Sequence, residues 1–307
     1  MMRGRHTAAV VIHRSSGGML VHEEQLNARL YGSKVSQWPL VRGLLLLFDM
    51  LVLGTRMMRF ATNVYIHDEL NTSGTEGSAQ ADAARAPVVE ATPAQMSGVG
   101  GVGLTLALVF SLALAIGLFF LLPLGATGLL EHWLHLGWWS LVVEGLIRLV
   151  ILLGYLAAIG RLASVERVFE YHGAEHKTIN AYEAGGPLNL QTVRRASRVH
   201  TRCGTGFLLI VVVLSIFVFA LLGQPPLPLL VLSRILLVPV IAALAYELMR
   251  LGAAHYRNPV VHWLMAPSLA LQGLTTREPD DQQIACAILA LERVLKSDGV
   301  SLQDFVA

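Results

Sequence analysis

No charged residue occurs between Glu90 and Glu131, and this gap constrains the fold more than any other feature of the chain. Within it, Val102–Leu124 supplies more than the ~20 apolar residues that a helix needs to cross a bilayer. The whole chain has 54% hydrophobic and 14% charged residues, whereas soluble domains carry about 25% charged residues. The sequence therefore predicts a membrane protein with polar parts, and it excludes collagen-like, coiled-coil and largely disordered chains.

Three further stretches are apolar and long enough to cross a membrane: Trp138–Ile159, Phe207–Leu222 and Ile235–Leu251. Two shorter apolar stretches, Leu44–Leu53 and Pro259–Leu274, contain a charged residue or a histidine with a proline, and they resemble the ~10–14 residue class of interfacial helices. We therefore expect a mainly α-helical integral membrane bundle of about four spans, with the two shorter stretches at the membrane surface.

The distribution of lysine and arginine orients these spans, because cytoplasmic loops carry the excess of positive charge. Residues 1–98 hold nine such side chains, the loop 125–137 none, the loop 160–206 seven, the loop 223–234 one, and the segment from Arg250 onward five. The sequence thus predicts that both termini and the loop 160–206 face the cytosol.

The polar segments have recognisable patterns. The runs Val10–Ile12 and Met19–His22 flank a Ser-Ser-Gly-Gly turn, which predicts a small β-hairpin in the N-terminal region. Residues 71–101 are rich in small polar residues and proline, which is typical of a flexible linker. Acids and a proline at Glu278–Asp281 precede apolar residues at helical spacing, which predicts a C-terminal amphipathic helix that holds Cys286 near its apolar stripe.

These patterns divide the chain into seven segments. They are a cytosolic β-rich cap (1–40), an interfacial helix region (41–70), a linker (71–101), spans one and two (102–159), a cytosolic His-rich loop (160–206), spans three and four (207–251) and a C-terminal interfacial segment with the amphipathic helix (252–307).

Charge and cysteine content exclude two classes of function. A net charge of +2 is too small for a nucleic-acid footprint, so we expect no nucleic-acid partner. The two cysteines, Cys203 and Cys286, are too few for a disulfide-stapled secreted scaffold, and they fit a reducing compartment or a chemical role for one of them. The basic run Arg194–Arg198 is typical of a segment that contacts anionic membrane lipid.

The loop 160–206 carries the most concentrated chemistry, beginning with His172, Glu175 and His176. If this segment is helical, the two histidines are four residues apart and share one face. The order His-x-x-Glu-His matches the inverted zincin pattern, in which two histidines bind zinc and the glutamate activates a water molecule. Glu183 lies seven residues beyond His176 on the same face and is a candidate carboxylate ligand.

A second cluster, His200 and Cys203, lies immediately before the third span. A cysteine ahead of a helix N-terminus is favoured as thiolate by the helix dipole. If 189–199 folds back as a short basic helix, these two residues and the two histidines of the first cluster complete a tetrahedral set for a divalent metal, with zinc expected. A structural site would use all four, and a catalytic site three. The alternative is a hydrogen-bonded polar cluster without metal.

Ionisable residues also occur inside the predicted spans. Glu144 and Arg148 are four residues apart in the second span, and we expect them to neutralise each other. Glu247 in the fourth span has Arg250 or Arg234 as candidate partners, and it either belongs to the histidine site or extends to the interface. His255 is a weaker candidate ligand, and His132 and His135 are expected to pack at the opposite interface.

The chain also resembles a known family, the YqhQ-like family of bacterial polytopic membrane proteins. The resemblance is carried by YHGAEHKTINAYE at 171–183, HTRCGTGF at 200–207, YELMR at 246–250, LTTREPDD at 274–281, the opening Met-Met-Arg-Gly and the region of Arg42 and Gly43. The family is a domain of unknown function, described as predicted metal-dependent enzymes. The resemblance implies an inner-membrane protein whose His-rich cytosolic loop binds a metal, and it implies no substrate.

This sequence departs from the family at its start. Family members usually carry a Gly-Gly-Gln-Ala-Val-Ile-Glu-Gly-Val-like stretch ahead of the Met-Met-Arg segment, and that stretch is absent here. One interpretation is that Met1 is not the true start, in which case the first strand of the N-terminal region lacks its partner.

Three hypotheses of different classes follow. The first is a metal-dependent enzyme of the bacterial inner membrane, hydrolase-like, in which His172 and His176 hold zinc, Glu175 is the catalytic base, and His200, Cys203 or Glu183 completes the shell. The alternative is a non-enzymatic scaffold or docking protein with a structural histidine/metal cluster, and a transporter is a third reading. Membrane lipid, a protein partner and a second copy of the chain are the expected kinds of partner.

Overall fold

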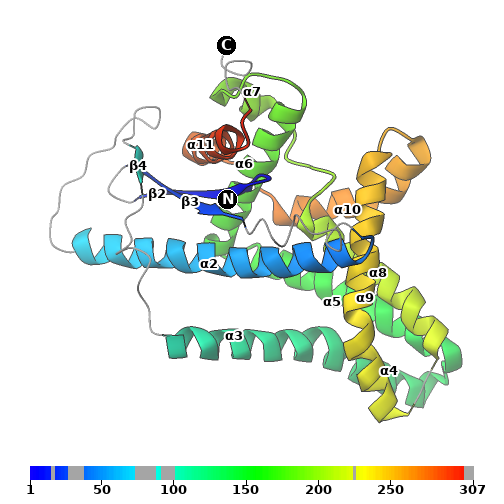
Figure 1. Ribbon diagram of the computed structural model, residues 1–307. Coiled ribbons are helices and arrows are strands. Elements are labelled where there is room, and N and C mark those ends of the chain that lie inside the picture. The colour runs from blue at the N-terminus through cyan, green and yellow to red at the C-terminus, as the bar shows by residue number, and fades with distance from the viewer. Residues whose placement is uncertain (15–17, 27–37, 73–87, 91–100, 224–225, 301–307) are drawn as a thin grey trace.

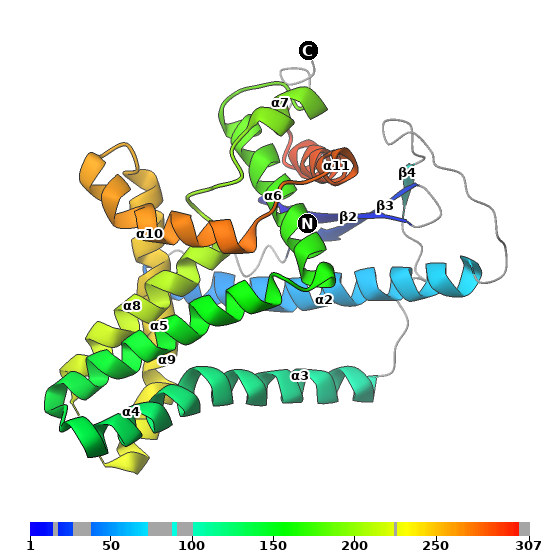
Figure 2. The same ribbon diagram turned by 180° about the vertical axis from the view of Figure 1, so that it is seen from behind.

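The computed structural model describes residues 1–14, 18–26, 38–72, 88–90, 101–223 and 226–300, and it contains a polar body and an apolar bundle of helices (Figure 1). The polar body consists of β1 (Met2–Arg3), β2 (Thr7–His13), β3 (Met19–Gln25), β4 (Val88–Glu90), α6 (Ala163–Glu183), α7 (Leu190–Arg195) and α11 (Asp281–Ser297). The bundle consists of α3 (Gly101–Ile116), η4 (Gly117–Leu121), α4 (Leu122–Leu134), η5 (Gly137–Trp139), α5 (Ser140–Ile159), α8 (Gly204–Leu222) and α9 (Leu227–Ala254). The helices α2 (Val41–Thr72) and α10 (Pro259–Thr275) run along the boundary between them (Figures 1 and 2).

The predicted N-terminal hairpin is confirmed. Strands β2 and β3 pair antiparallel, with Val10 opposite His22, and β1 pairs antiparallel with β2. The turn predicted at 15–18 lies outside the described residues except for Gly18. β4 pairs in parallel with β3 and lies within the segment for which the sequence predicts a linker; residues 73–87 and 91–100 of that linker lie outside the described residues.

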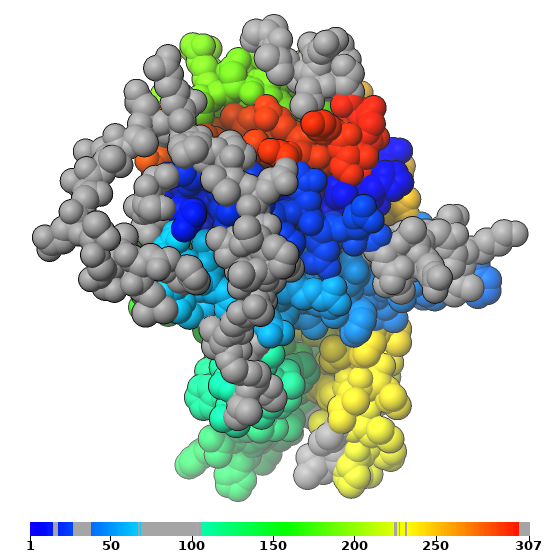
Figure 3. All heavy atoms as spheres, turned by 60° about the vertical axis from the view of Figure 1, so that its left-hand side comes forward, coloured from blue at the N-terminus to red at the C-terminus, as the bar shows by residue number. Residues whose placement is uncertain are grey.

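The sheet is the middle layer of a three-layer body, because it buries apolar side chains on both faces. Side chains alternate between the faces of a strand, so Ala9 and Val11 pack against α11 while Ala8 and Val10 pack towards α2. On α2 the matching side chains are Leu53, Met57, Phe60 and Val64, all buried. The body therefore has one core on each side of the sheet, and Figure 3 shows the order of the layers, with α11 (red) above the strands (blue) and α2 (light blue to cyan) below them.

The predicted C-terminal amphipathic helix is confirmed as α11. Asp280 caps its N-terminus by accepting a hydrogen bond from the Gln283 backbone N–H, and the Gln283 side chain returns a hydrogen bond to Asp280, which forms a capping box. The apolar stripe that includes Ile284, Ile288 and Leu291 is buried against the sheet and α6. Cys286 is also buried there, as the pattern predicts.

The boundary helix α2 has apolar side chains on two faces. One face packs on the sheet, whereas Phe48, Leu51 and Met58 on other faces are 65–70% exposed. A 32-residue helix is about 48 Å long, and Figure 1 shows that it crosses beneath the sheet along the top of the bundle. Large exposed apolar side chains on such a helix are typical of a membrane-surface element.

The predicted fold class is confirmed, since the described chain contains four helices that are long and apolar enough to cross a membrane. They are Leu106–Leu134, Gly137–Ile159, Gly204–Leu222 and Pro228–Ala254. The first extends ten residues beyond the predicted end at Leu124, and it changes direction at the π-helical turn η4 (Figure 2). The others match the predicted spans to within a few residues, except that the fourth is longer at its start.

A charged cluster is buried inside the bundle, and it differs from the simple pair that the sequence predicts. Glu144 does bind Arg148, at 2.5 Å, but its other oxygen accepts a hydrogen bond from Arg234 of α9 at 3.0 Å. The Arg234 guanidinium also lies 3.7 Å from the ring centroid of Phe219 in α8. One carboxylate therefore bridges two guanidinium groups, and the cluster joins α5, α8 and α9.

Arg148 also donates a hydrogen bond to a backbone carbonyl that has no helical donor because of a proline. Pro123 has no N–H, so the carbonyl of Phe119, four residues earlier, lacks its normal helical donor. The Arg148 Nε donates to this carbonyl at 2.9 Å, and its Nη1 donates to the Ser215 hydroxyl at 3.3 Å. In an apolar medium an unsatisfied carbonyl costs several kcal/mol, so Arg148 stabilises the bend between η4 and α4.

Glu247 binds neither of the arginines considered from the sequence. Its carboxylate accepts hydrogen bonds from the Arg42 guanidinium, at 2.7 Å for Nε, and from the Leu40 backbone N–H at 3.2 Å. A Cβ at Gly43 would lie 2.9 Å from Cδ1 of Tyr246, so the glycine allows α2 to approach α9 closely at this point. The ion pair therefore anchors the start of α2 to the fourth candidate span.

The three-membered cluster predicts an asymmetry between two substitutions. Glu144→Gln leaves two buried guanidinium groups unpaired and should lower the free energy of unfolding by about 3 kcal/mol, whereas Arg234→Gln leaves the Glu144–Arg148 pair intact and should cost about 1 kcal/mol. Thermal unfolding of the detergent-purified protein measures both, with Leu146→Met at an exposed position of α5 as the control. Equal losses for Glu144→Gln and the control would contradict the cluster.

Candidate metal centre

His172 and His176 lie one turn apart on α6, and their rings share one face as the spacing predicts, with centroids 4.3 Å apart. In both rings Nδ1 contacts a backbone carbonyl: that of Thr275 at 2.9 Å from His172, and that of Arg198 at 2.7 Å from His176. A carbonyl accepts but cannot donate, so each Nδ1 carries the proton and each Nε2 keeps a free lone pair when the ring is neutral.

Close packing of α6 on the end of α10 places the Thr275 carbonyl. A side chain at Gly173 would collide with the backbone carbonyl of Arg277, so the glycine permits the approach that brings Thr275 next to His172. The Arg277 N–H also donates to the Phe169 carbonyl at 2.9 Å. The connection between α10 and α11 is therefore fixed against the same face of α6 that carries the histidines.

Cys203 is the N-cap of α8, and its thiol reaches the two histidines. Its Sγ lies 3.4 Å from Nε2 of His172 and 3.0 Å from the Thr205 hydroxyl, and the Thr205 backbone N–H donates to it at 3.4 Å. The ligand atoms of His172, His176 and Cys203 all lie within 4.8 Å of one another. Nitrogen and sulfur ligands of a tetrahedral zinc ion are about 3.5 Å apart, so the His172–Cys203 distance fits a shared metal.

The electrostatics of this cluster favour a thiolate. Burial opposes ionisation of Cys203, but hydrogen bonds with His172, His176 and Thr205 prevail and lower the pKa of the thiol to about 5. Burial is the largest influence on the His172 imidazole and lowers its pKa, but the hydrogen bond with Cys203, the charges of Cys203 and Glu175, and the contact with the Thr275 carbonyl together raise it above its usual value. By contrast, burial raises the pKa of the Cys286 thiol to about 11. Cys203 is thus the cysteine with the character of a metal ligand.

His200 and Glu183 lie beside this cluster and bind each other. The His200 Nε2 is 3.3 Å from a Glu183 carboxylate oxygen, and the His200 ring centroid is 5.9 Å from that of His176. Burial lowers the pKa of His200. Among the described residues the group of candidate ligand atoms within metal-binding distance consists of His172, His176 and Cys203, so the structure places His200 and Glu183 next to this group.

Glu175 also lies on α6, outside the group of candidate ligand atoms. Its carboxylate forms an ion pair with the amino group of Met1. Together these two residues line an apolar cavity of about 940 Å³ between the sheet, α2 and α6. Of the other histidines considered, His255 is exposed at the end of α9, where its Nδ1 contacts the Leu251 carbonyl.

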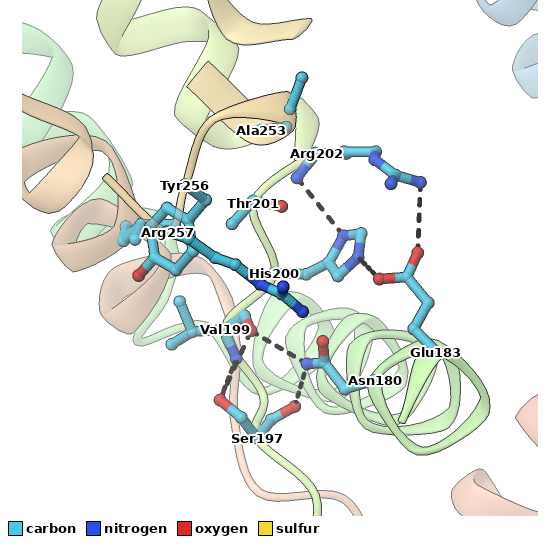
Figure 4. Close-up of a pocket in the computed structure, with 12 residues that line it drawn as sticks. Asn180, Glu183, Ser197, Val199, His200, Thr201, Arg202, Ala253, Tyr256 and Arg257 are labelled. Carbon is cyan, nitrogen blue, oxygen red and sulfur yellow. Dashed lines mark hydrogen bonds and ion pairs between the residues drawn. The ribbon is translucent and has the colours of Figure 1, made fainter. Parts of the chain in front are cut away.

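A polar cavity of about 700 Å³ opens next to His200 (Figure 4). It is lined by residues from the end of α6, the segment 197–202, the end of α9, the turn that follows it, and α10. They are Asn180, Glu183, Ser197, Val199, His200, Thr201, Arg202, Ala253, Ala254, Tyr256, Arg257 and Leu269. The Arg202 guanidinium donates to Glu183 at 3.2 Å, so the histidine, the glutamate and this arginine form one chain of contacts at the cavity wall.

Residues 38–297 match the family described as "Protein of unknown function (DUF1385)". The chain belongs to this family. It is also 30% identical over 312 residues to the "Uncharacterized protein YqhQ" of Bacillus subtilis (strain 168), across 99% of this chain and 92% of that protein. The resemblance expected from the sequence is thereby confirmed, and the family match includes every residue of the cluster. No solved structure matches the chain.

Sequence reasoning missed the residues of this family member that hold the cluster in place. Gln272 of α10 is fully buried, and it both accepts from the His200 N–H at 2.9 Å and donates to the His200 carbonyl at 2.8 Å. The Thr275 hydroxyl donates to that of Thr205 at 3.2 Å. Glutamine and threonine in an otherwise apolar helix were a signal for such a role, but the sequence does not name their partners.

The lowered pKa of Cys203 predicts its titration. In metal-free protein the thiolate should persist as pH falls from 8 and be half protonated near pH 5, which absorbance at 240 nm measures. His172→Ala removes a stabilising hydrogen bond and should shift the midpoint upward by at least one pH unit. Cys203→Ser should abolish the signal in this range, since the pKa of Cys286 is raised. A wild-type midpoint above pH 8 would contradict the cluster geometry.

Proposed function

We propose that this chain is a metal-dependent protein of the bacterial cytoplasmic (inner) membrane, with both termini in the cytosol and one zinc ion held by His172, His176 and Cys203. We further propose that the site is hydrolase-like. The distribution of lysine and arginine supports the orientation. The observation that carries the proposal is the convergence of two imidazole lone pairs on one thiol that is favoured as thiolate.

The hydrogen bonds that Nδ1 of each histidine makes support the proposal of a bound metal. Histidine ligands in metal sites usually donate their second ring N–H to a carbonyl or carboxylate, which fixes the tautomer and the ring orientation. His172 and His176 both have such a contact, with Thr275 and Arg198. Two imidazoles and one thiolate are ligands that zinc prefers, and they resemble the set found in catalytic sites with an open position.

The surroundings support hydrolysis. A three-ligand zinc site leaves a coordination position for water, whose pKa the metal lowers to about 7. The neighbouring cavity gives a substrate access to His200 and Glu183. The His200 Nε2 donates to Glu183 and its Nδ1 accepts from the Arg202 N–H, so the Glu183 carboxylate would be the group that accepts a proton from such a water. Glu175 lines the separate cavity between the sheet, α2 and α6, so we assign the proton acceptor to Glu183, positioned by His200, in preference to the Glu175 that the motif favours.

A structural metal is the second candidate, and one observation favours it. The cluster joins α6, the N-terminus of α8 and the end of α10. A zinc ion there would clip the polar body to the bundle without catalysing a reaction. In that case His200 or another group would close the fourth position.

Metal content tests the proposal directly. Mass spectrometry of the detergent-purified protein should find about one zinc per chain, and the His172→Ala/His176→Ala double variant should lose at least nine tenths of it. His255→Ala, which removes an exposed histidine outside the cluster, should keep the metal. Wild-type protein with no bound transition metal would end the metal-dependent interpretation.

Cobalt substitution separates the catalytic from the structural site. If a coordination position is open to water, azide should change the visible d–d spectrum of the Co²⁺ protein in a saturable way. The spectrum of His200→Gln should then match that of the wild type, because His200 is not a ligand. A spectrum that is insensitive to azide and altered in His200→Gln would establish a closed, structural site.

A further inference from the structure

Two cavities adjoin at the boundary between the polar body and the bundle. The first is the polar cavity beside His200, and the second, of about 430 Å³, lies between α2 and α9. They share Arg202, Ala253 and Ala254 in their walls. The second is lined otherwise by Leu46, Tyr246, Met249 and Arg250, so it is mainly apolar with one further arginine.

The first cavity has an excess of positive charge. Arg202 and Arg257 line it, with Glu183 as the one carboxylate among its lining residues. Arg257 is exposed and forms no ion pair within the described part of the chain, and Figure 4 shows its side chain extending from the turn between α9 and α10 towards His200. Thr201 and Tyr256 add hydroxyl groups to the wall. Because Glu183 already pairs with Arg202, Arg257 carries the net positive charge of these lining residues, and such a cavity favours an anion.

The position of the cavities indicates what this anion is attached to. The adjoining turn is followed by Val260, Trp263 and Leu264 of α10, which are 63–73% exposed, and Phe48 and Leu51 of α2 are exposed on the other side. Large exposed apolar side chains on helices that flank candidate spans mark the membrane surface. Phosphate groups of lipids lie at this depth, next to the acyl chains.

We propose that Arg202 and Arg257 bind a phosphate ester, and that the adjoining apolar cavity holds the apolar part of the same molecule. The substrate class is then an anionic lipid with a phosphomonoester headgroup. This inference rests on the proposed function, since it names what the zinc site acts on. Guanidinium groups bind phosphate oxygens in a bidentate manner, and a phosphomonoester, which carries two charges, can pair with Arg257 and compete with Glu183 for Arg202.

The test is an isothermal calorimetric titration of the full-length, detergent-purified protein with dioctanoyl phosphatidic acid. Dioctanoylglycerol, which lacks the phosphate, and glycerol 3-phosphate, which lacks the chains, are the matched ligands. Arg202→Gln/Arg257→Gln should weaken phosphatidic acid binding at least tenfold. The control Arg161→Gln/Arg195→Gln removes two exposed arginines that line neither cavity, and it should stay within twofold of the wild type.

A second variant guards against a loss of folding. Arg257→Gln keeps the ion pair of Arg202 with Glu183, and it should still weaken binding at least threefold. Equal affinities of wild type and both cavity variants for phosphatidic acid, or equal affinities of the wild type for dioctanoylglycerol and phosphatidic acid, would overturn the proposal. If glycerol 3-phosphate competes at the same affinity as the lipid, the phosphate site stands and its ligand is a soluble phosphate ester.

Measuring the metal content distinguishes failure of the lipid-binding proposal from failure of the proposed metal-dependent function. The arginine variants should retain zinc, and the His172→Ala/His176→Ala variant should still bind phosphatidic acid within threefold of the wild type, because the phosphate contacts do not include the metal ligands. Zinc without arginine-dependent lipid binding would overturn the substrate class alone. Arginine-dependent lipid binding without zinc would overturn the metal-dependent function alone.

Discussion

The chain buries polar groups at the boundary between its polar body and the bundle. These groups need hydrogen-bond partners inside the protein, and this requirement determines how the two parts are joined. Gln272 of α10 pairs with both backbone groups of His200, and the Thr275 carbonyl accepts from His172. Glu247 of α9 likewise holds Arg42 at the start of α2. Leaving the buried polar groups of Gln272 and His200 unpaired would cost about 1–3 kcal/mol each, so these contacts fix α6, α8 and α10 in one arrangement.

The same contacts pre-organise the candidate metal centre. A histidine whose Nδ1 donates to a fixed carbonyl has one tautomer and one ring orientation, and its Nε2 is then ready to bind a metal without further loss of side-chain freedom. The carbonyls come from Thr275 and Arg198, which lie on two other segments of the chain. The rigidity of the site therefore depends on how tightly the helices pack at the boundary. The hydrogen bonds that stabilise the fold there also orient the proposed metal ligands.

The proposed metal site and the two cavities lie on one boundary, next to elements that present apolar side chains outward. His200 belongs to both regions, because its ring lies near His176 and its Nε2 contacts Glu183 in the cavity wall. A phosphate bound between Arg202 and Arg257 would thus be adjacent to the group that we assign as proton acceptor. This arrangement relates the charge of the cavity to the chemistry of the cluster.

The sequence alone determined the apolar helices, the β-hairpin, the C-terminal helix and the pairing of His172 with His176, because each depends on local periodicity or on the absence of charge over one stretch. It also identified Cys203 as a candidate ligand from its place before a helix. Only the tertiary structure decided that Glu144 binds Arg234 as well as Arg148, that Glu247 binds Arg42, and that Glu175 lies with Met1. These contacts join residues up to 205 positions apart, and such pairings follow from how helices pack and from which buried group lacks a partner. A local sequence pattern contains no information on how helices pack or on which buried group lacks a partner.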